Sequence, residues 1–423
     1  MNPVRQNARV LTAALVGTAV EFYDFYIYAT AAALVFGPLF FPAQSPAAQL
    51  ALSFLTFGIA FFARPVGAIA FGHFGDRIGR KSTLVASLLL MGGSTLLIAF
   101  LPTYAMAEGW GAGWIAPALL CLLRFGQGFG LGGEWGGAAL LAVENAPKGW
   151  EARFGAAPQF GAPVGFLAAN GLFLILGQCL SDADFRAWGW RVPFLLSAVL
   201  VGVGLWVRLK IGETPQFKAA LAHEKPPAVP LARLFAQHGW AVIAGTAGAV
   251  ACFAIFYLAT AFALAIGTGP LGYARTDFLS IQLAANCFLA LGIAVAAWRA
   301  DRLGSRSTLA WGAAATVVLG FIFGPGLQSG SLLTVFATLS AALFVMGYVY
   351  GPLGAWLPTL YPPLVRYSGV SVAFNAGGIV GGALTPFVAQ GMAASGNLIF
   401  VGMLISLAGL LTLLGVLTAR AAD

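Results

Sequence analysis

The sequence predicts an all-α membrane protein with twelve transmembrane helices in two pseudo-symmetric bundles of six. Of its 423 residues, 60% are hydrophobic and only 9% are charged, whereas soluble domains carry roughly 25% charged residues. Apolar stretches of the length needed to cross a bilayer, roughly 20 residues, recur along the whole chain. The longest polar segment lies near the middle, from about Lys210 to Gln237, and divides these stretches into two sets.

The apolar stretches between charged or proline-rich segments give the expected spans. In order, they cover residues 11–36, 48–73, 82–101, 115–143, 155–179, 188–208, 237–268, 277–298, 307–326, 331–358, 368–392 and 395–419. The first stretch continues past Glu21 and Asp24, so it is longer than the apolar core of a secretory signal peptide. We therefore interpret it as a membrane span and not as a cleaved leader.

Two domains of six helices are expected, at residues 1–210 and 237–423, joined by a cytoplasmic linker at 211–236. A faint internal repeat supports this division. The motif Gly72–Lys81 follows the second span, and the shorter, similar Asp301–Arg306 follows the eighth. Repeated halves around a central site are typical of carriers that work by alternating access.

The distribution of Lys and Arg predicts the orientation. With the N-terminus inside, most of the 22 basic residues fall in inner segments, and only Arg186, Arg191 and Arg275 lie on the outer side. This positive-inside bias places both termini in the cytoplasm, with the inner membrane of a bacterium as the expected location. The net charge of +8 is then a signal of orientation, so we expect membrane lipid and no nucleic acid as a partner.

Five charged side chains lie away from the ends of the expected spans, all in the first half: Glu21, Asp24, Arg64, Arg124 and Glu134. Inserting such a residue at a helix centre costs roughly 2.5–3.5 kcal/mol, so a functional role is the default interpretation. Glu21 and Asp24 are three residues apart on one helix face and lie about 15–20 Å from the cytoplasmic edge. Arg124 is also near mid-depth, whereas Arg64 and Glu134 lie closer to the cytoplasm.

We expect Glu21, Asp24 and Arg124 to form a central site for an anionic substrate and a proton. Arginine holds a carboxylate through two parallel hydrogen bonds, and a carboxylate removed from water tends to take up a proton. Arg64 and Glu134 are expected to form either an inner gate or a pair of mutually compensating charges. The alternative for all five is that they only neutralise one another and hold helices together.

The second half offers no buried charge within its spans. Its polar side chains at membrane depth are expected either to shape substrate selectivity or to make interhelical hydrogen bonds: Tyr257, Gln282, Asn286, Tyr350 and Asn375. The four cysteines lie apart in apolar stretches, without the spacing of a metal site or a disulfide framework. We expect no metal and no cofactor, with protons as the coupling ion.

A glycine-rich string in the fourth span, Gly128-Phe-Gly130-Leu-Gly-Gly133, matches a dinucleotide-binding pattern. The strand that this pattern requires is missing, because the string lies inside a long apolar helix. Gly128, Gly132 and Gly136 recur every four residues, so they leave one helix face nearly bare. We interpret that face as a close contact between membrane helices.

Several segments together resemble the major facilitator superfamily, and specifically its metabolite:proton symporter branch. They include Gly72-His-Phe-Gly-Asp76-Arg77-Ile-Gly79-Arg80-Lys81, Ala63-Arg64-Pro65-Val-Gly67, Glu21-Phe-Tyr-Asp24-Phe-Tyr, Arg124-Phe-Gly-Gln-Gly, Gly132-Gly-Glu134-Trp-Gly-Gly, Glu213-Thr-Pro and Arg366-Tyr-Ser-Gly369. Any one of these segments alone would be a weak signal. Their order and spacing over nearly the whole chain are highly specific.

The resemblance implies the major facilitator fold, with two bundles rocking around a central site and driven by the proton gradient. It also implies a cytoplasmic gate formed by Gly72, Asp76, Arg77, Gly79, Arg80 and Lys81, with Asp301 and Arg302 in the second half. Ser305 stands where the family usually has another Arg, so we expect a weaker second gate. Members of this branch carry shikimate, α-ketoglutarate, citrate, aromatic acids, or zwitterions such as proline and betaine.

The sequence and the resemblance together predict a monomeric secondary transporter that moves a small, shikimate-like organic acid with protons. A symporter of a zwitterion such as betaine or proline is the alternative. A membrane sensor, a uniporter and an antiporter also stay open. No nucleophile–base pair or metal-ligand cluster occurs, so we do not expect an enzyme.

Overall fold

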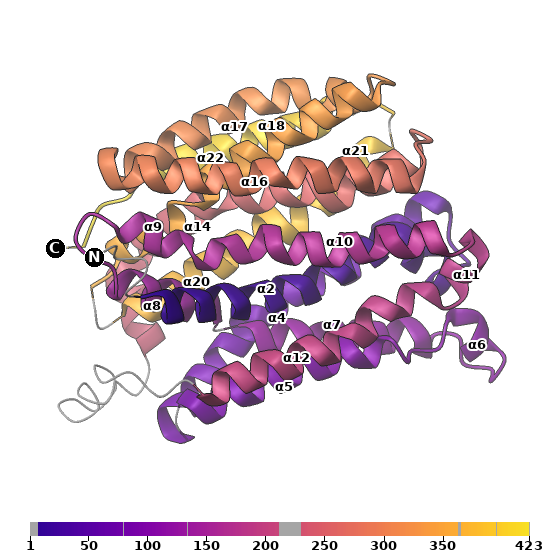
Figure 1. Cartoon of the computed structure of the whole chain (residues 1–423), viewed down its shortest axis with the longest axis horizontal. Helices are drawn as coiled ribbons and strands as arrows, with labels where there is room; N and C mark the ends of the chain where they lie inside the picture. Colours follow the sequence, from indigo (N-terminus) through magenta and orange to yellow (C-terminus); the bar gives the residue numbers. More distant parts are fainter. Residues whose placement is uncertain are drawn as a thin grey trace.

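The computed structural model describes residues 7–78, 80–132, 134–210, 230–362, 365–394 and 396–422. Every regular element in these ranges is helical, and none of them contains a strand. The long helices lie side by side along one axis (Figure 1), and the first described helix begins at the same end of the bundle where the last one ends. We call this end the termini side and the opposite end the far side.

The structure confirms the order of the twelve expected spans. In the described part of the chain, eleven helical stretches are long and apolar enough to cross a membrane: Ala14–Phe40, Pro46–Phe71, Ile115–Glu144, Glu151–Cys179, Gly189–Trp206, Leu234–Thr268, Arg275–Leu303, Ser305–Leu327, Leu332–Leu360, Arg366–Ala393 and Ile399–Thr418. The twelfth is the shorter apolar helix Val85–Ile98. Each matches an expected span to within a few residues.

The first half is built from six spans. Its elements are α2 (Ala8–Ala31), η1 (Ala32–Phe36), α3 (Gly37–Phe40), α4 (Pro46–Ile78), α5 (Arg80–Ile98), α6 (Tyr104–Glu108), α7 (Ile115–Leu131), α8 (Glu134–Glu144), α9 (Glu151–Ala156), η2 (Pro158–Phe160), α10 (Gly161–Cys179), α11 (Asp182–Ala187), η3 (Gly189–Arg191) and α12 (Val192–Lys210). The first span changes from α to π geometry at η1. The short helices α6, α11 and η3 connect spans on the far side (Figure 1).

The second half repeats this layout. Its elements are α14 (Pro230–Tyr257), η4 (Leu258–Phe262), α15 (Ala263–Thr268), α16 (Arg275–Leu303), α17 (Ser305–Leu327), α18 (Leu332–Tyr350), α19 (Leu353–Trp356), η5 (Leu357–Leu360), α20 (Arg366–Gly378), η6 (Ile379–Leu384), α21 (Thr385–Ala393) and α22 (Ile399–Thr418). Helix α14 kinks at His238, next to the expected domain boundary at residue 237. Most of the expected linker, residues 211–229, lies outside the described residues.

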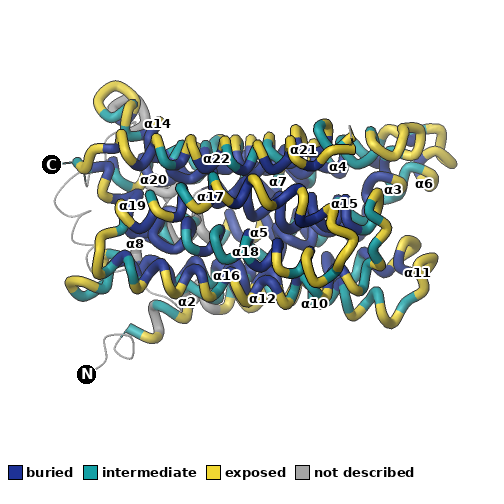
Figure 2. The backbone as a smooth tube through the Cα atoms, turned by 90° about the horizontal axis from the view of Figure 1, so that it is seen from above, coloured by how far each residue is buried: buried dark blue, intermediate teal, exposed yellow. Residues whose placement is uncertain are grey.

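The outer surface of the bundle is apolar. Leu333 is 75% exposed, Trp110 72% and Phe321 70%, and Figure 2 shows exposed residues along the outside of a buried interior. Large contiguous apolar surfaces of this kind are unfavourable in water and mark contact with lipid or another apolar partner. The surface therefore fits a protein embedded in a bilayer.

Glycines bring the functional helices of the first half together. A Cβ atom at Gly128 would overlap the backbone of Ala60, and one at Gly132 would overlap the backbone of Arg64. Helices α7 and α4 therefore pack with their backbones in near contact, as the four-residue glycine spacing predicts. This packing places Arg124 of α7 and Arg64 of α4 on neighbouring helices.

Candidate functional site

A small cavity lies between the two halves near the middle of the bundle. Its volume is about 40 Å³, which is room for a few water molecules at about 10–15 Å³ each. The lining residues from the first half are Glu21, Phe22, Phe25, Arg64, Leu131, Gly132, Trp135 and Gly136, and those from the second half are Phe253, Tyr257, Ser371, Phe374 and Asn375. Ligand sites usually measure about 300–1,000 Å³, so this cavity is smaller than a usual ligand site.

Arg64 and Glu21 are the charged residues that line this cavity. The Arg64 guanidinium carbon lies 4.4 Å from the centroid of the Phe25 ring and 4.8 Å from that of Phe61. Its Nε is buried and has no hydrogen-bond partner among the described residues. The cavity wall therefore carries one cation and one anion, both from the first half.

Arg124, which we expected in the central site, does not line the cavity. It is fully buried, and its guanidinium carbon lies 4.1 Å from the ring centroids of both Phe25 and Tyr28. Nε and Nη2 donate to the main-chain oxygen of Phe57 at 3.3 and 3.2 Å, and Nη1 donates to Oε1 of Gln127. Arg124 is thus enclosed by aromatic rings and hydrogen-bonded within the first half.

Asp24 is also buried away from the cavity. Its Oδ1 accepts a hydrogen bond of 2.5 Å from the Ser197 hydroxyl, and its Oδ2 has no partner among the described residues. The main-chain oxygen of Asp24 accepts from Gln127 Nε2 at 3.0 Å, so Gln127 connects this residue to Arg124. The expected cluster of Glu21, Asp24 and Arg124 is therefore divided. Three residues of helix leave about 60° between two side chains, and this angle turns Glu21 to the cavity and Asp24 to α12.

Four aromatic side chains separate the cavity from Arg124. This aromatic layer consists of Phe25, Phe57, Phe61 and Tyr257. Ring centroids lie 5.1 Å apart for Phe25–Phe61, 5.3 Å for Phe25–Phe57 and 5.0 Å for Phe57–Tyr257. Phe25 contacts both arginines, Arg64 at 4.4 Å and Arg124 at 4.1 Å.

Of the five polar residues expected from the second half, Tyr257 and Asn375 line the cavity, whereas Gln282, Asn286 and Tyr350 do not. Gln282 donates to the main-chain oxygens of Ala259 and Thr260, at 3.0 and 2.9 Å, and so satisfies carbonyl groups of the π-helical segment η4. Asn286 donates to the oxygen of Pro163 across the two halves at 2.9 Å. These two side chains make interhelical hydrogen bonds, which was the alternative interpretation.

The sequence did not single out the aromatic floor of the cavity. Trp135 and Phe374, one from each half, stack with ring centroids 3.5 Å apart and planes 3° from parallel. Beside them, Asn375 Nδ2 donates to the oxygen of Gly132 at 3.1 Å. Ser371, also missed, lines the cavity with a buried hydroxyl that has no partner among the described residues. The only sequence signal was the position of Trp135 within a glycine-rich segment beside Glu134.

The first-half gate predicted from the resemblance is only partly described. Asp76 and Arg77 lie in α4, and Arg80 and Lys81 in α5, but the side chains of residues 72–84 are outside the described part of the structure, as is Gly79 altogether. The side chain of Glu134 is likewise not described. The expected pairing of Arg64 with Glu134 therefore stays a prediction.

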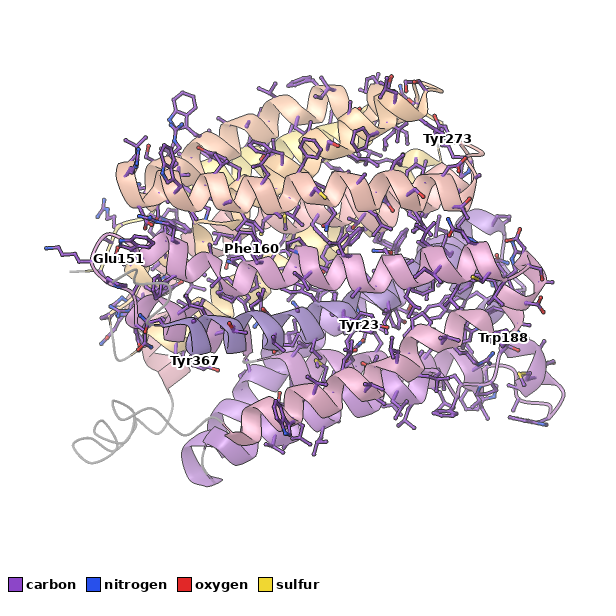
Figure 3. The ribbon with its side chains drawn as sticks, in the orientation of Figure 1. Tyr23, Glu151, Phe160, Trp188, Tyr273 and Tyr367 are labelled. Atoms are coloured by element: carbon purple, nitrogen blue, oxygen red, sulfur yellow. The ribbon has the colours of Figure 1, made fainter. Side chains whose placement is uncertain are left out.

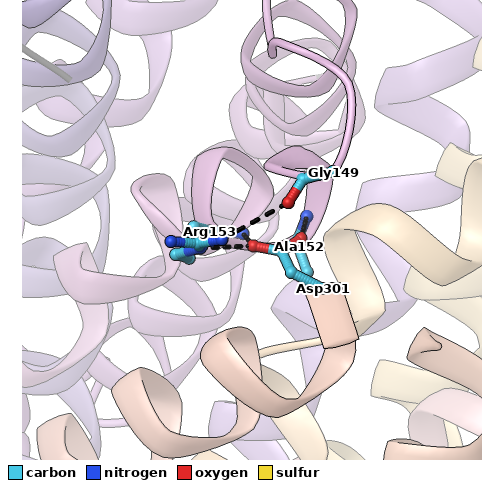
Figure 4. A network of polar contacts seen from close by, with 4 residues as sticks. All are labelled: Gly149, Ala152, Arg153 and Asp301. Atoms are coloured by element: carbon cyan, nitrogen blue, oxygen red, sulfur yellow. Dashed lines mark hydrogen bonds and ion pairs between the residues drawn. The ribbon is translucent and has the colours of Figure 1, made fainter. Parts of the chain in front are cut away.

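The second-half gate residue Asp301 connects the halves on the termini side. Figure 4 shows its carboxylate against the start of α9. Its oxygens accept from the main-chain nitrogens of Ala152 at 2.7 Å and Arg153 at 3.3 Å, and from Arg153 Nε at 2.5 Å. Asp301 makes these contacts although Ser305 replaces the Arg that is usual in the family. Arg302 does not take part in them, because its guanidinium carbon lies 4.0 Å from the ring centroid of Trp298.

A second connection between the halves lies on the far side. Arg275, at the start of α16, pairs with Asp182 of α11 at 2.9 Å, and its guanidinium carbon lies 4.1 Å from the ring centroid of Phe185. Figure 3 labels Trp188 and Tyr273 at this end, and Glu151 and Tyr367 at the other. Contacts at each end of α16 thus hold it to the first half.

Comparison with known proteins places this architecture among transporters. The chain matches the "sugar (and other) transporter" family model twice, over residues 10–233 and 223–419. It is 45% identical to the inner membrane metabolite transport protein YhjE of Escherichia coli K12, over 98% of this chain and 94% of that protein. Identity to the shikimate transporter of the same organism is 37%, covering 91% and 87% of the two chains.

More distant matches agree with this grouping. The proline/betaine transporter of Escherichia coli K12 is 28% identical, over 96% of this chain and 82% of that one. The solved structure of a D-xylose–proton symporter superimposes with a TM-score of 0.74, at 16% identity and over 97% and 96% of the two chains. At that identity the likeness concerns the fold alone.

Proposed function

We propose that this chain, which belongs to the sugar (and other) transporter family of the major facilitator superfamily, carries a small organic acid across the membrane together with protons. It is a multi-pass membrane protein and a transporter of small metabolites, not an enzyme. The observation that carries the finer proposal is the position of Arg64 and Glu21 on one cavity between the two halves. The substrate class we propose is a shikimate-like mono- or dicarboxylate.

Arg64 is the proposed anchor for the substrate carboxylate. The guanidinium fork matches a carboxylate through two parallel hydrogen bonds. Arg64 faces the cavity, and its Nε has no partner among the described residues. The aromatic rings of Phe25 and Tyr257, which line the same cavity, offer apolar surface for the carbon skeleton of the substrate.

Glu21 is the proposed proton carrier, in place of Asp24. While Glu21 is ionised, its charge compensates Arg64 inside a low-dielectric site, so a substrate carboxylate added there would leave a net negative charge. Protonation of Glu21 removes this competition, so Arg64 can hold the substrate anion. One proton and one carboxylate then enter together, which is the requirement for symport.

Transport requires the cavity to open to one side at a time. The two connections of α16, Asp301 with Arg153 and Arg275 with Asp182, are the proposed inner and outer latches. Separation at one latch, with the other kept closed, would enlarge the cavity towards one side of the membrane. We propose that the termini side faces the cytoplasm of a bacterial inner membrane, in line with the positive-inside distribution and with the location that the name of YhjE gives for that relative.

A zwitterion is the second candidate substrate. Arg64 and Glu21 lie on the same cavity, and such a pair can hold a carboxylate and a cationic group at once. The proline/betaine transporter is the more distant of the relatives compared, so the organic acid is favoured.

Transport into proteoliposomes distinguishes these possibilities. With an imposed inward proton gradient, the purified protein should accumulate shikimate-like acids above the external concentration and acidify the lumen as it does so. Accumulation of betaine but not of acids would overturn the substrate assignment in favour of the zwitterion. Equal uptake with and without the gradient would overturn proton coupling, and binding without any counterflow would indicate a sensor.

A further inference from the structure

A second, larger concavity lies away from the transport site, on the second half of the bundle. Its volume is about 400 Å³, and it is lined by Arg299 of α16, Trp311 and Ala315 of α17, and Phe344, Val345 and Tyr348 of α18. Trp311 is 63% exposed, so the groove opens on the outer, apolar surface. The transport mechanism uses none of these six residues.

The groove has a polar end and an apolar end. Arg299 lies four residues before the termini-side end of α16, and Tyr348 lines the same groove. At about 1.5 Å per residue, Arg299 is about 6 Å from that end and belongs to the interfacial level on the termini side. Ala315 lies ten residues into α17, about 15 Å from the termini-side start of that helix and so about 9 Å deeper than Arg299, and Phe344 and Val345 line the groove with it. The groove therefore extends from the headgroup level into the hydrocarbon.

Arg299 supplies a positive charge at the polar end that the described protein does not use. Its Nε is buried without a hydrogen-bond partner among the described residues. The carboxylate nearest in sequence, Asp301, is already engaged by Arg153 and the start of α9. The ring centroid of Trp311 is 6.0 Å from the guanidinium carbon, so this ring forms a wall beside the cation without covering it.

We propose that this groove binds an anionic phospholipid of the leaflet on the termini side, with its phosphate at Arg299 and an acyl chain along Ala315, Phe344 and Val345. Arginine and phosphate form charge-assisted hydrogen bonds, and the Tyr348 hydroxyl is placed to donate to the same group. Basic sites between membrane helices select anionic headgroups in this way. The apolar depth of the groove selects a lipid over a free phosphate ion.

The site lies next to the termini-side connection between the halves. Arg299 and Asp301 are two residues apart at the end of α16, and Asp301 holds the first half through Arg153. A lipid that fixes this end of α16 to α17 and α18 therefore restrains the segment that carries the latch. The lipid site itself does not depend on which substrate the protein carries.

Native mass spectrometry of the purified protein in detergent tests the proposal, with dioleoyl phosphatidylglycerol, dioleoyl phosphatidylcholine and inorganic phosphate as separate probes. We expect the anionic lipid to be retained in preference to the zwitterionic one, and phosphate alone not to be retained. Arg299→Gln should weaken retention of phosphatidylglycerol roughly tenfold or more, the loss expected for one charge-assisted hydrogen bond. The matched control, Arg302→Gln, removes an exposed charge three residues away and should leave retention within about twofold.

A second variant tests the apolar end and does not depend on how Arg299→Gln folds. Ala315→Trp fills the deep part of the groove from an exposed position and leaves every charge in place. It should weaken phosphatidylglycerol retention severalfold while the melting temperature in detergent without added lipid stays unchanged. Equal retention of both lipids, or no loss in either variant, would overturn the proposal. Retention of inorganic phosphate that survives Ala315→Trp would show a simple anion site instead.

Discussion

The first half contains two arginine–carboxylate sets, and they differ in what surrounds them. Arg64 and Glu21 lie on the cavity wall. Arg124 and Asp24 lie behind the aromatic layer, where Phe57, Gln127 and Ser197 satisfy most of their hydrogen-bonding groups. Phe25 contacts both guanidiniums, so the two sets share one aromatic neighbour. A buried arginine whose donors are already engaged stabilises the bundle, whereas one with an unused donor at a cavity can bind a ligand.

The most severe test of this difference is Arg64→Gln. We expect substrate binding and uptake to fall by at least roughly 100-fold, because two charge-assisted hydrogen bonds of about 1.5–3 kcal/mol each are lost. Arg64→Lys, which keeps the charge but not the fork, should be intermediate. Calorimetric binding in detergent and uptake into proteoliposomes would measure both. Binding by Arg64→Gln within about threefold of wild type would remove Arg64 from the site.

Glu21→Gln and Asp24→Asn form a matched pair for proton coupling. In the wild type, binding of the acid should strengthen as the pH falls, because Glu21 must be protonated before Arg64 is released. Glu21→Gln should abolish uphill accumulation, retain substrate exchange and make binding independent of pH. Asp24→Asn should still accumulate substrate, because its side-chain oxygen can accept from Ser197 as before.

The reverse outcome has a clear meaning. If Asp24→Asn loses accumulation while Glu21→Gln keeps it, the coupling proton resides on Asp24, behind the aromatic layer, and not on Glu21. The same liposome assay, with exchange as the internal control for folding, separates these outcomes.

Arg124→Gln should act on stability and not on affinity. It leaves the buried main-chain oxygen of Phe57 without its donors, at a cost of about 1–3 kcal/mol. It also removes cation–π contacts worth up to about 2 kcal/mol. We expect a lower melting temperature in detergent but a dissociation constant per folded molecule within about threefold of wild type. A hundredfold loss of affinity at unchanged stability would transfer the anchor role to Arg124.

Single aromatic substitutions should give the smallest effects, and they distinguish the surroundings of Arg64 from those of Arg124. Phe61 contacts Arg64, and Phe57 contacts Arg124. Phe61→Leu should therefore weaken substrate binding a few-fold, whereas Phe57→Leu should mainly lower the melting temperature. Phe25→Leu should do both, with each cation–π contact contributing about 0.5–2 kcal/mol. Identical profiles for Phe57→Leu and Phe61→Leu would mean that the layer does not divide the two regions.

Membrane insertion explains why the spans could be predicted and the site only in part. A span needs a run of apolar residues whatever its neighbours are, so its ends follow from composition. The depth of a residue in the membrane likewise follows from its position along its own helix, and Glu21, Asp24 and Arg124 do lie well inside their spans. The direction in which each side chain points depends on how its helix is rotated against neighbours, and no pattern within the helix gives that rotation.

The polar residues of the second half illustrate the same limit. Gln282 and Asn286 are four residues apart on one helix, yet one donates to carbonyls of η4 and the other to Pro163 of the opposite half. Their partners are main-chain oxygens, which every residue possesses, so the sequence does not mark them. The contact of Trp135 with Phe374 was hidden for a similar reason, since aromatic residues are common in apolar helices.

The first span of each half contains a π-helical turn, η1 and η4, and the two turns touch each other towards the far side. A π turn carries one surplus residue compared with an α turn. If the π turn moved along the helix, each residue that it passed would turn about the helix axis by about 100°. Such a move exchanges only a few main-chain hydrogen bonds. A shift of the two π turns would therefore change which side chains of these two spans face each other towards the far side, without a tilt of either half.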